Sequence, residues 1–119
     1  MIKFKGIPYR SHEEWQFAIR LDEIGVNFVN EYRFDESRRY RLDFAIIDKK
    51  IGFEIEGIGP RGRETRHQRF KGYMEDCEKY NLAVSQGWRI YRIPTPWINS
   101  KQYAHKLIKF LEVFNEKFE

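Results

Sequence analysis

The chain is poor in the features that anchor, export or cross-link a protein. Cys77 is its single cysteine, which excludes an internal disulfide and a zinc site built from several cysteines. No stretch of the sequence reaches the roughly 18 consecutive apolar residues of a helical membrane span. The opening residues, Met-Ile-Lys-Phe-Lys-Gly, lack the apolar core of a secretory signal. We therefore expect a soluble protein of the cytoplasm, with no membrane partner.

The composition favours one folded domain. A length of 119 residues allows a single hydrophobic core. Apolar residues make up 41% of the chain and aromatic residues 17%, which is enough to fill that core and argues against disorder. The net charge is +4 and the isoelectric point is near 9.2. These values suit an anionic partner without identifying it.

Hydrophobic periodicity in the first half of the chain predicts one helix followed by three strands. Ser11 with Glu14 is a capping-box pattern that opens the helix, and Gly25 ends it. Segments rich in aromatic and β-branched residues then predict strands over 28–34, 42–47 and 51–57.

The second half of the chain predicts two more helices around one strand. A helix is expected over 67–86, ended by Gly87. Its apolar stripe consists of Phe70, Tyr73, Cys77, Tyr80 and Val84. A strand over 88–93 and a helix from Ser100 follow. The order helix, three strands, helix, strand, helix predicts a single α/β domain over 1–119, with a mixed central sheet flanked by helices.

Acidic residues fall on the two strands that a short polar turn joins. In the later strand, alternation places Glu54 and Glu56 on one face and the apolar residues on the other. Asp43 lies between Leu42 and Phe44 and is expected to face away from both. A hairpin loop of two or four residues brings Asp43 opposite Glu54 or Glu56, whereas a loop of three residues would reverse this.

Three carboxylates on one sheet face repel one another unless a cation lies among them. Neighbours at i and i+2 on one strand are about 7 Å apart, and a cross-strand neighbour is about 5 Å away. Mg²⁺ suits such a cluster because it binds a few carboxylates and completes its shell with water and phosphate oxygens. A metal held there activates water for phosphodiester hydrolysis. The alternative is a solvated sheet face that happens to carry three acids.

The order Asp43, Glu54, Glu56 resembles the motif of the PD-(D/E)XK nuclease superfamily, an Asp followed after a gap by acid-x-Lys. The chain is most similar to small phage and bacterial members that look like very-short-patch-repair endonucleases. The similarity continues through Arg66-His67, Arg69, Gly72, Asp76, Glu78-Lys79-Tyr80-Asn81, Gly87-Trp88 and Arg92. It implies a restriction-endonuclease-like domain that cuts DNA with Mg²⁺, for which Mn²⁺ should substitute. The three acids would be both catalytic and metal-binding, and a phage-encoded protein would act in the host cytoplasm.

One position departs from the superfamily pattern. Glu56 stands where most members carry the motif lysine, which orients the attacking water and steadies developing charge. A lysine from the following helix is the natural replacement. Lys79 is our first candidate, because it lies at helical spacing from Asp76 and off the apolar stripe. Lys71 is the second candidate, and for either lysine the alternative is an ordinary exposed side chain.

The resemblance suggests two further site residues. Archaeal-type Holliday-junction resolvases, another branch of the superfamily, are similar in having a glutamate on the first helix as an extra metal ligand. Glu14 fits this position but also fits the capping box, and Glu13 is an alternative ligand. His67 follows a basic, glycine-rich loop, and the resemblance implies a catalytic role at the scissile phosphate. The alternative for His67 is a surface or capping histidine.

Two basic clusters flank the acidic strands in sequence. We expect both to bind DNA phosphates, because arginine contacts phosphate oxygens in pairs and releases counterions. The clusters are Arg38, Arg39 and Arg41, and then Arg61, Arg63, Arg66, Arg69 and Lys71. A solvated basic surface is the alternative. No module for reading bases is visible, so we expect recognition of DNA shape.

These features favour a structure-selective DNA endonuclease, with a homodimeric Holliday-junction resolvase as the first hypothesis. A twofold dimer suits the symmetric cutting of a junction, and Trp97 and Tyr103 are interface candidates, although core packing explains them as well. The alternatives are a monomeric mismatch- or nick-directed repair endonuclease and a catalytically inactive DNA-binding module of the same fold. An RNA substrate is less expected, because no aromatic stacking motif for single strands is apparent.

Overall fold

The chain divides into two compact units in a computed structural model that describes residues 2–57 and 65–118. The central unit comprises Val29–Glu54 and Ile58–Tyr91, and the terminal unit comprises Met1–Phe28, Ile55–Gly57 and Arg92–Glu119. Two predicted DNA-binding residues, Arg61 and Arg63, lie outside the described residues. The single domain that we predicted over the whole chain stays a prediction.

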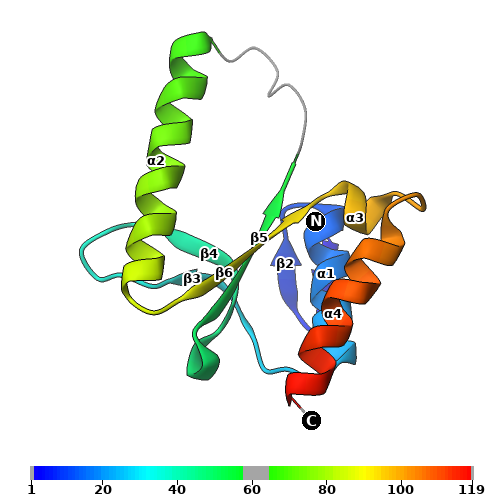
Figure 1. Cartoon of the computed structure of the whole chain (residues 1–119). Coiled ribbons are helices and arrows are strands. Elements are labelled where there is room, and N and C mark those ends of the chain that lie inside the picture. The colour runs from blue at the N-terminus through cyan, green and yellow to red at the C-terminus, as the bar shows by residue number, and fades with distance from the viewer. Residues whose placement is uncertain (1, 58–64, 119) are drawn as a thin grey trace. The chain divides into compact units, whose positions relative to one another are not determined.

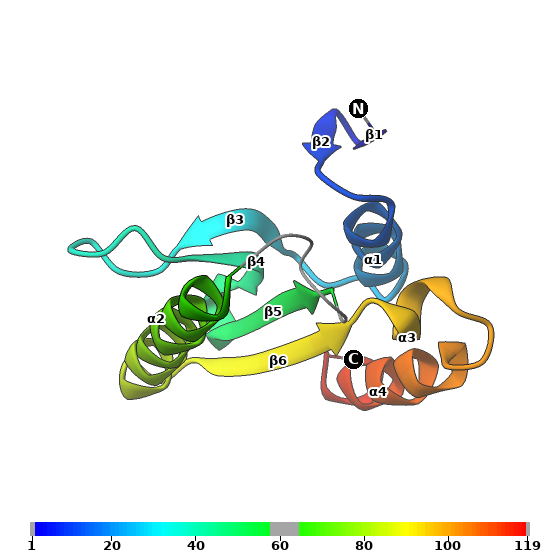
Figure 2. The ribbon, with the colours of Figure 1, turned by 90° about the horizontal axis from the view of Figure 1, so that it is seen from above.

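A four-stranded sheet with the order β3-β4-β5-β6 runs through the chain. Its strands are β3 (Val29–Arg33), β4 (Arg41–Ile46), β5 (Ile51–Glu56) and β6 (Arg89–Pro94). β3 with β4 and β4 with β5 are antiparallel. β5 and β6 run in the same direction (Figure 2). Two backbone hydrogen bonds agree with this parallel pairing. The amide of Arg89 donates to the carbonyl of Lys50 at 2.9 Å, and the amide of Thr95 donates to the carbonyl of Glu56 at 2.8 Å. The α/β class and the mixed sheet are therefore confirmed.

The hairpin between β4 and β5 has the register parity that we predicted. Phe44 pairs with Phe53 and Ile46 with Ile51, so odd positions of one strand meet even positions of the other. The connection is a 3-10 turn, η1 (Ile47–Lys49), followed by Lys50 in the left-handed region with φ of 51°. This loop contains four residues, one of the two lengths that give this parity, because β4 ends at Ile46 and not at the predicted Ile47.

The predicted alternation around Asp43 is wrong at one position. Leu42 does not share the face of Phe44 but lies over Gly52, where an added Cβ would come within 2.7 Å of the Leu42 Cδ1 atom. Glu31 stands opposite Asp43 in the register of β3 and β4 and has a left-handed φ of 49°. A left-handed residue interrupts the pleat, which accounts for the departure from strict alternation.

The helix α2 (Arg66–Ser85) covers the central unit's part of the sheet (Figure 1). Thr65 and Gln68 form a complete capping box at its start, with Thr65 accepting from the Gln68 amide at 3.1 Å and the Gln68 side chain accepting from the Thr65 amide at 2.8 Å. Gly87 follows its end with a left-handed φ of 89°, as predicted for a helix-terminating glycine. Near this end the helix packs into a core of Phe34, Leu42, Ala45, Ala83 and Trp88.

The apolar stripe predicted for α2 is not buried. Phe70, Tyr73 and Val84 are 62%, 68% and 62% exposed, whereas Ala83, outside the stripe, is fully buried. Phe70 and Tyr73 are exposed because the first half of α2 extends past β3 and β4 (Figure 1). Periodicity identified the helix correctly but not its buried face, since only Cys77 and Tyr80 of the predicted stripe are half-buried.

The terminal unit contains the remaining helices and a hairpin that we did not predict. The hairpin pairs β1 (Ile2–Phe4) with β2 (Ile7–Tyr9). The helix α1 (His12–Glu23) is capped by Ser11, whose hydroxyl accepts from the Glu14 amide at 3.1 Å. The predicted last helix is divided into α3 (Pro96–Asn99) and α4 (Ala104–Phe118). Buried side chains in this unit include Phe17, Leu21, Ile93, Leu107 and Leu111.

Among the helices of residues 2–57 and 65–118, none combines the length and the apolarity that crossing a bilayer requires.

Candidate active site

Glu54 and Lys79 form an ion pair inside the central unit. The Lys79 Nζ atom donates to the Glu54 Oε1 atom, and the two side chains are 16% and 6% exposed for lysine and glutamate respectively. Glu54 reaches this place from β5, and Lys79 reaches it from the fourth turn of α2. The structure therefore brings our first-choice lysine to one of the predicted catalytic carboxylates.

Further donors surround the Glu54 carboxylate. The Asp43 amide donates to Oε2 at 2.9 Å, and the Tyr80 hydroxyl lies 3.5 Å from Oε1. The Lys79 ammonium also lies 5.5 Å from the centre of the Tyr80 ring, within range of a cation–π interaction. A charged group buried in this way is costly unless it is paired and hydrogen-bonded. Glu54 meets both conditions through residues of β4 and α2.

Asp43 is half-buried on β4 and adjoins Glu54. Continuing the β4–β5 register by one residue beyond Phe44 and Phe53 places Asp43 opposite Glu54. The contact that links them is from the backbone amide of Asp43 to the Glu54 carboxylate. Two of the three predicted acidic residues are thus neighbours in the central unit, joined through the Asp43 backbone.

Glu56, the third predicted acid, lies in the terminal unit and is paired with Arg92. The Arg92 Nε atom donates to the Glu56 Oε1 atom at 2.6 Å. β5 and β6 are neighbouring parallel strands, so residues near their ends come side by side. We had noted Arg92 only as part of the resemblance, and we did not predict its contact with Glu56. A basic residue on the strand next to the acidic one was the signal for this pair.

The donor chemistry suits a hard divalent cation, although a ready-made three-ligand site is absent. Within the described residues, no group of three or more His, Cys, Asp or Glu side chains is arranged to hold a metal ion. Mg²⁺ is often bound by only one or two carboxylates, together with water and phosphate. Each carboxylate oxygen has two lone pairs, so the hydrogen bonds on Glu54 leave it capacity for a metal. Asp43 and Glu54 therefore fit such an ion.

The two first-helix glutamates belong to the terminal unit. Glu13 accepts a hydrogen bond from the Asn99 Nδ2 atom at 2.8 Å, and this bond holds the pKa of the Glu13 carboxyl below its usual value. Glu14 is half-buried, and its amide donates to the Ser11 hydroxyl. The metal-binding role of Glu14, and the alternative role of Glu13, stay predictions.

Predicted site residues on α2 lie at its start and are exposed. His67 is the second residue of the helix, and Arg66, Arg69 and Lys71 occupy the same two turns. Lys71, our second candidate for the missing lysine, lies 3.9 Å from the Glu75 carboxylate. Of the two lysine candidates, only Lys79 contacts Glu54.

The other basic cluster lies in and after an ordered loop between β3 and β4. Arg38, Arg39 and Arg41 are all exposed. The guanidinium of Arg33 fixes the loop by donating to the Arg38 carbonyl at 2.8 Å and the Glu36 carbonyl at 2.7 Å, an arrangement that sequence reasoning missed. Arg38 in turn pairs with Glu78 of α2 at 2.6 Å.

Asp35 also stabilises this loop. Its Oδ1 atom accepts from the amide of Ser37 at 2.8 Å and from the Ser37 hydroxyl at 2.7 Å. The hydrogen bond from the hydroxyl is the main cause of a lowered pKa for the Asp35 carboxyl. The loop that presents Arg38 and Arg39 is therefore preorganised by local hydrogen bonds.

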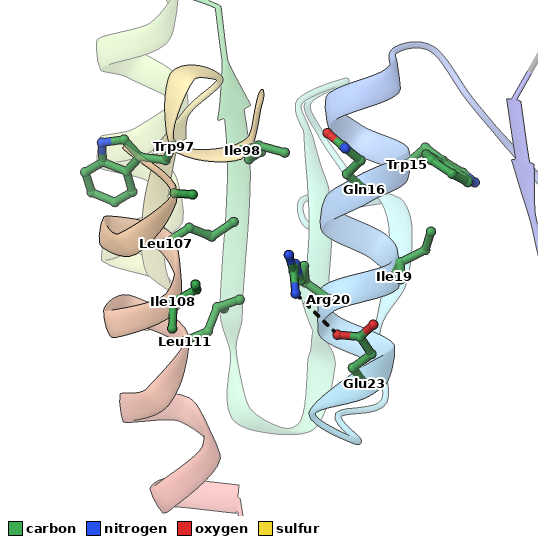
Figure 3. Close-up of a pocket in the computed structure, with 11 residues that line it drawn as sticks. Trp15, Gln16, Ile19, Arg20, Glu23, Trp97, Ile98, Leu107, Ile108 and Leu111 are labelled. Atoms are coloured by element: carbon green, nitrogen blue, oxygen red, sulfur yellow. Dashed lines mark ion pairs between the residues drawn. The ribbon is translucent and has the colours of Figure 1, made fainter. Parts of the chain in front are cut away.

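A cavity of about 290 Å³ in the terminal unit contains none of the predicted site residues (Figure 3). Leu107 and Leu111 of α4 point across it toward α1, where Arg20 and Glu23 form an ion pair at 3.7 Å. Trp97, which we considered for an interface, lines this cavity. This cavity lies between the helices of the terminal unit.

No family model matches the chain, and no curated protein matches it. Among solved structures, it is similar to the Homing Endonuclease I-Bth0305I Catalytic Domain, with a TM-score of 0.62 and 17% sequence identity. The match covers 88% of this chain and 97% of that one. At this level of identity the likeness concerns the fold. The chain therefore has the α/β fold found in a homing endonuclease catalytic domain.

Proposed function

We propose that the chain is a metal-dependent endonuclease that hydrolyses phosphodiester bonds in DNA. The observation that carries this proposal is the buried Glu54–Lys79 pair beside Asp43. A lysine ammonium paired with a strand carboxylate is part of the combination that the PD-(D/E)XK pattern requires, although this lysine comes from α2 instead of β5. The likeness to a homing endonuclease catalytic domain supports the same activity.

In this proposal Asp43 and Glu54 hold Mg²⁺, with Glu56 and Glu14 as further predicted ligands. When bound, Mg²⁺ activates water and neutralises charge on the phosphate. Glu54 also holds the Lys79 ammonium in place through its Oε1 atom. Lys79 then stabilises negative charge that develops on the phosphate, an effect that is strengthened by its burial.

The remaining predicted residues would bind and orient the DNA backbone. His67 is assigned to the scissile phosphate, and the exposed arginines and Lys71 at the start of α2 are assigned to neighbouring phosphates. Arg38, Arg39 and Arg41 would contact the backbone from the β3–β4 loop. Such contacts position DNA without reading its sequence.

For the substrate, our first proposal remains branched DNA cut by a homodimeric Holliday-junction resolvase. Its support is the glutamate on the first helix, Glu14, which resembles the extra metal ligand of archaeal-type resolvases. The second candidate is a monomeric repair endonuclease directed to mismatches or nicks. The third is a DNA-binding module without catalysis, which the exchange of the motif lysine for Glu56 would permit.

Incubation of the purified protein with four-way junction, mismatch, flap and linear duplex DNA separates these candidates. Paired symmetric nicks in the junction, in Mg²⁺ but not in EDTA, are expected for the resolvase. Cutting only beside a mismatch or nick would favour the repair enzyme. Binding in EDTA without any cutting after Mg²⁺ or Mn²⁺ is restored would reject the catalytic proposal.

Substitution of Lys79 tests the assignment of the active site. Lys79→Gln and Asp43→Asn should each slow cleavage about 100-fold or more, because each removes a group that stabilises charge or holds the metal. Affinity for DNA in EDTA should change little. Single-turnover cleavage and a binding titration measure the two effects.

Lys71→Gln is the matched comparison, since it removes an exposed lysine from the same helix without touching Glu54. It should lower the affinity for DNA by removing a phosphate contact, and it should leave single-turnover cleavage at saturating protein unchanged. Lys79→Arg keeps the positive charge and checks that Glu54 remains paired, with circular dichroism as the readout of folding. A folded Lys79→Gln protein that cleaves at the wild-type rate would contradict the assignment.

A further inference from the structure

The first half of α2 exposes a cluster of large apolar side chains. Phe70, Tyr73 and Met74 are 62%, 68% and 54% exposed. They stand at positions i, i+3 and i+4 of the helix, so they are neighbours on one side of it. We call these three residues the aromatic face of α2. A contiguous exposed apolar patch of this kind marks a binding surface more often than a chance arrangement.

Positive charge lies at the N-terminal side of the aromatic face. Arg66, Arg69 and Lys71 lie on the same two turns and are exposed. The segment 65–74 contains no Asp or Glu, and the first acidic residue of the helix is Glu75. These cations sit at the positive end of the helix dipole, where acidic residues are normally preferred. Their placement is unfavourable for the isolated helix and favourable for an anionic partner.

This charge also decides between possible occupants. In a twofold dimer the same patch meets itself, and parallel packing of the two helices would bring Arg66 and Arg69 toward the equivalent arginines of the second copy. Like charges brought together at an interface oppose association. A polyanion with flat apolar groups can pair with the cations and stack on the rings.

The aromatic face is separate from the candidate active site. Phe70 and Lys79 are nine residues apart on α2, and at 3.6 residues per turn this is about two and a half turns. At a rise of 1.5 Å per residue, Phe70 therefore lies about 14 Å from Lys79 along the helix axis. Loss of the aromatic face should thus leave the Glu54–Lys79 pair intact.

We propose that the aromatic face binds DNA through unpaired bases. The rings of Phe70 and Tyr73 would stack on bases, while the nearby cations contact the backbone, which is how single strands are held without sequence preference. Paired bases in an intact duplex hide their faces, so the preferred substrates are DNAs with gaps, bubbles or branch points. The proposal rests on the proposed function only in taking DNA as the polyanion.

The test compares binding of two fluorescein-labelled DNAs in EDTA. One is a duplex, and the other is the same duplex with a short run of unpaired thymines at its centre. The wild-type protein should prefer the second DNA. Phe70→Ala and Tyr73→Ala should each weaken binding to it about tenfold, as expected for loss of one stacking contact, while binding to the intact duplex changes less than about twofold.

Val84→Ala is the matched control, because Val84 is as exposed as Phe70 and lies at the other end of the same helix. It should leave both affinities unchanged. Arg69→Ala should weaken binding to both DNAs by a similar factor and reduce the slope of log affinity against log salt by about one. A 2-aminopurine in the unpaired run should lose fluorescence with the wild-type protein and not with the Phe70→Ala/Tyr73→Ala protein.

Equal losses on both DNAs, or no loss on either, would overturn the proposal. So would a double variant that changes only self-association in sedimentation, or only binding to phosphatidylserine vesicles. Because binding is measured without metal, the result is independent of cleavage. A wild-type protein that prefers unpaired DNA but never cuts would refute the proposed enzyme and leave this inference standing.

Discussion

Gly52 is a position where the central unit has no room for a side chain. An added Cβ would lie 2.7 Å from the Leu42 Cδ1 atom and 3.1 Å from the Ile90 Cδ1 atom. Both neighbours are core side chains packed between the sheet and α2. Gly52 is also two residues before Glu54 on β5. The absence of a side chain here lets Leu42 fill the space behind the candidate active site.

Gly52→Ala should therefore destabilise the protein by about 1–3 kcal/mol, the usual cost of overpacking a core. Gly72→Ala is the control, because Gly72 lies within α2 and an added Cβ there meets nothing within 4 Å. This second change should stabilise the protein by about 0.5–1 kcal/mol through helix propensity. Urea unfolding measures both. A Gly52→Ala protein as stable as the wild type would show that Leu42 moves aside at no cost.

At the scale of elements, α2 depends on its own local signals at one end and on packing at the other. Its buried residue, Ala83, lies near the C-terminal end, where it joins the core of the central unit. The exposed residues Phe70 and Tyr73 give the N-terminal half little packing. Helix stability in proteins comes mostly from a packed face. The capping box of Thr65 and Gln68 is therefore the main local stabiliser of the first turns.

Thr65→Ala should cost about 1 kcal/mol, the typical effect of losing a side-chain N-cap. Amide hydrogen exchange should accelerate in the first turns of α2 and remain unchanged near Ala83. Thr95→Ala is the control, since Thr95 precedes α3 without making a side-chain capping bond. Unchanged exchange in the first turns after Thr65→Ala would mean that other contacts hold this end of the helix.

At the scale of the whole molecule, each compact unit contains two of the predicted metal ligands. Asp43 and Glu54 belong to the central unit, and Glu56 and Glu14 to the terminal unit. Each unit also contains an acid–base pair on β5, Glu54 with Lys79 and Glu56 with Arg92. An ion that binds only the folded protein must raise its stability by mass action. The melting temperature is therefore a test of metal binding that does not depend on finding the substrate.

Mg²⁺ or Mn²⁺ at 100 times its dissociation constant should stabilise the folded protein by about 2.7 kcal/mol relative to EDTA. Asp43→Asn should abolish the increase in melting temperature, because it removes a proposed ligand. Glu75→Gln should retain it, since Glu75 is an exposed carboxylate beside Lys71 and is not among the predicted ligands. Equal metal-induced shifts in the wild type and in Asp43→Asn would remove Asp43 from the metal site.

The sequence by itself determined the local features of this protein. Short-range patterns predicted strands β3 to β6, the helix α1 with its Ser11 cap, and the pairing of odd with even positions in the β4–β5 hairpin. Periodicity, caps and turn length act over only a few residues. Candidate acids on neighbouring strands followed from the same rules. The short β1–β2 hairpin and the division of the last helix had no strong periodic signal and were missed.

Only the tertiary structure decided which side chains meet. It turned Leu42 over Gly52, left Phe70 and Tyr73 exposed, and brought Lys79 to Glu54. These outcomes depend on where α2 crosses the sheet and on how far the helix extends beyond the sheet. Packing between residues that are distant in sequence sets both. A helical pattern gives the spacing of side chains around the axis, and the burial of each one depends on what lies beside the helix.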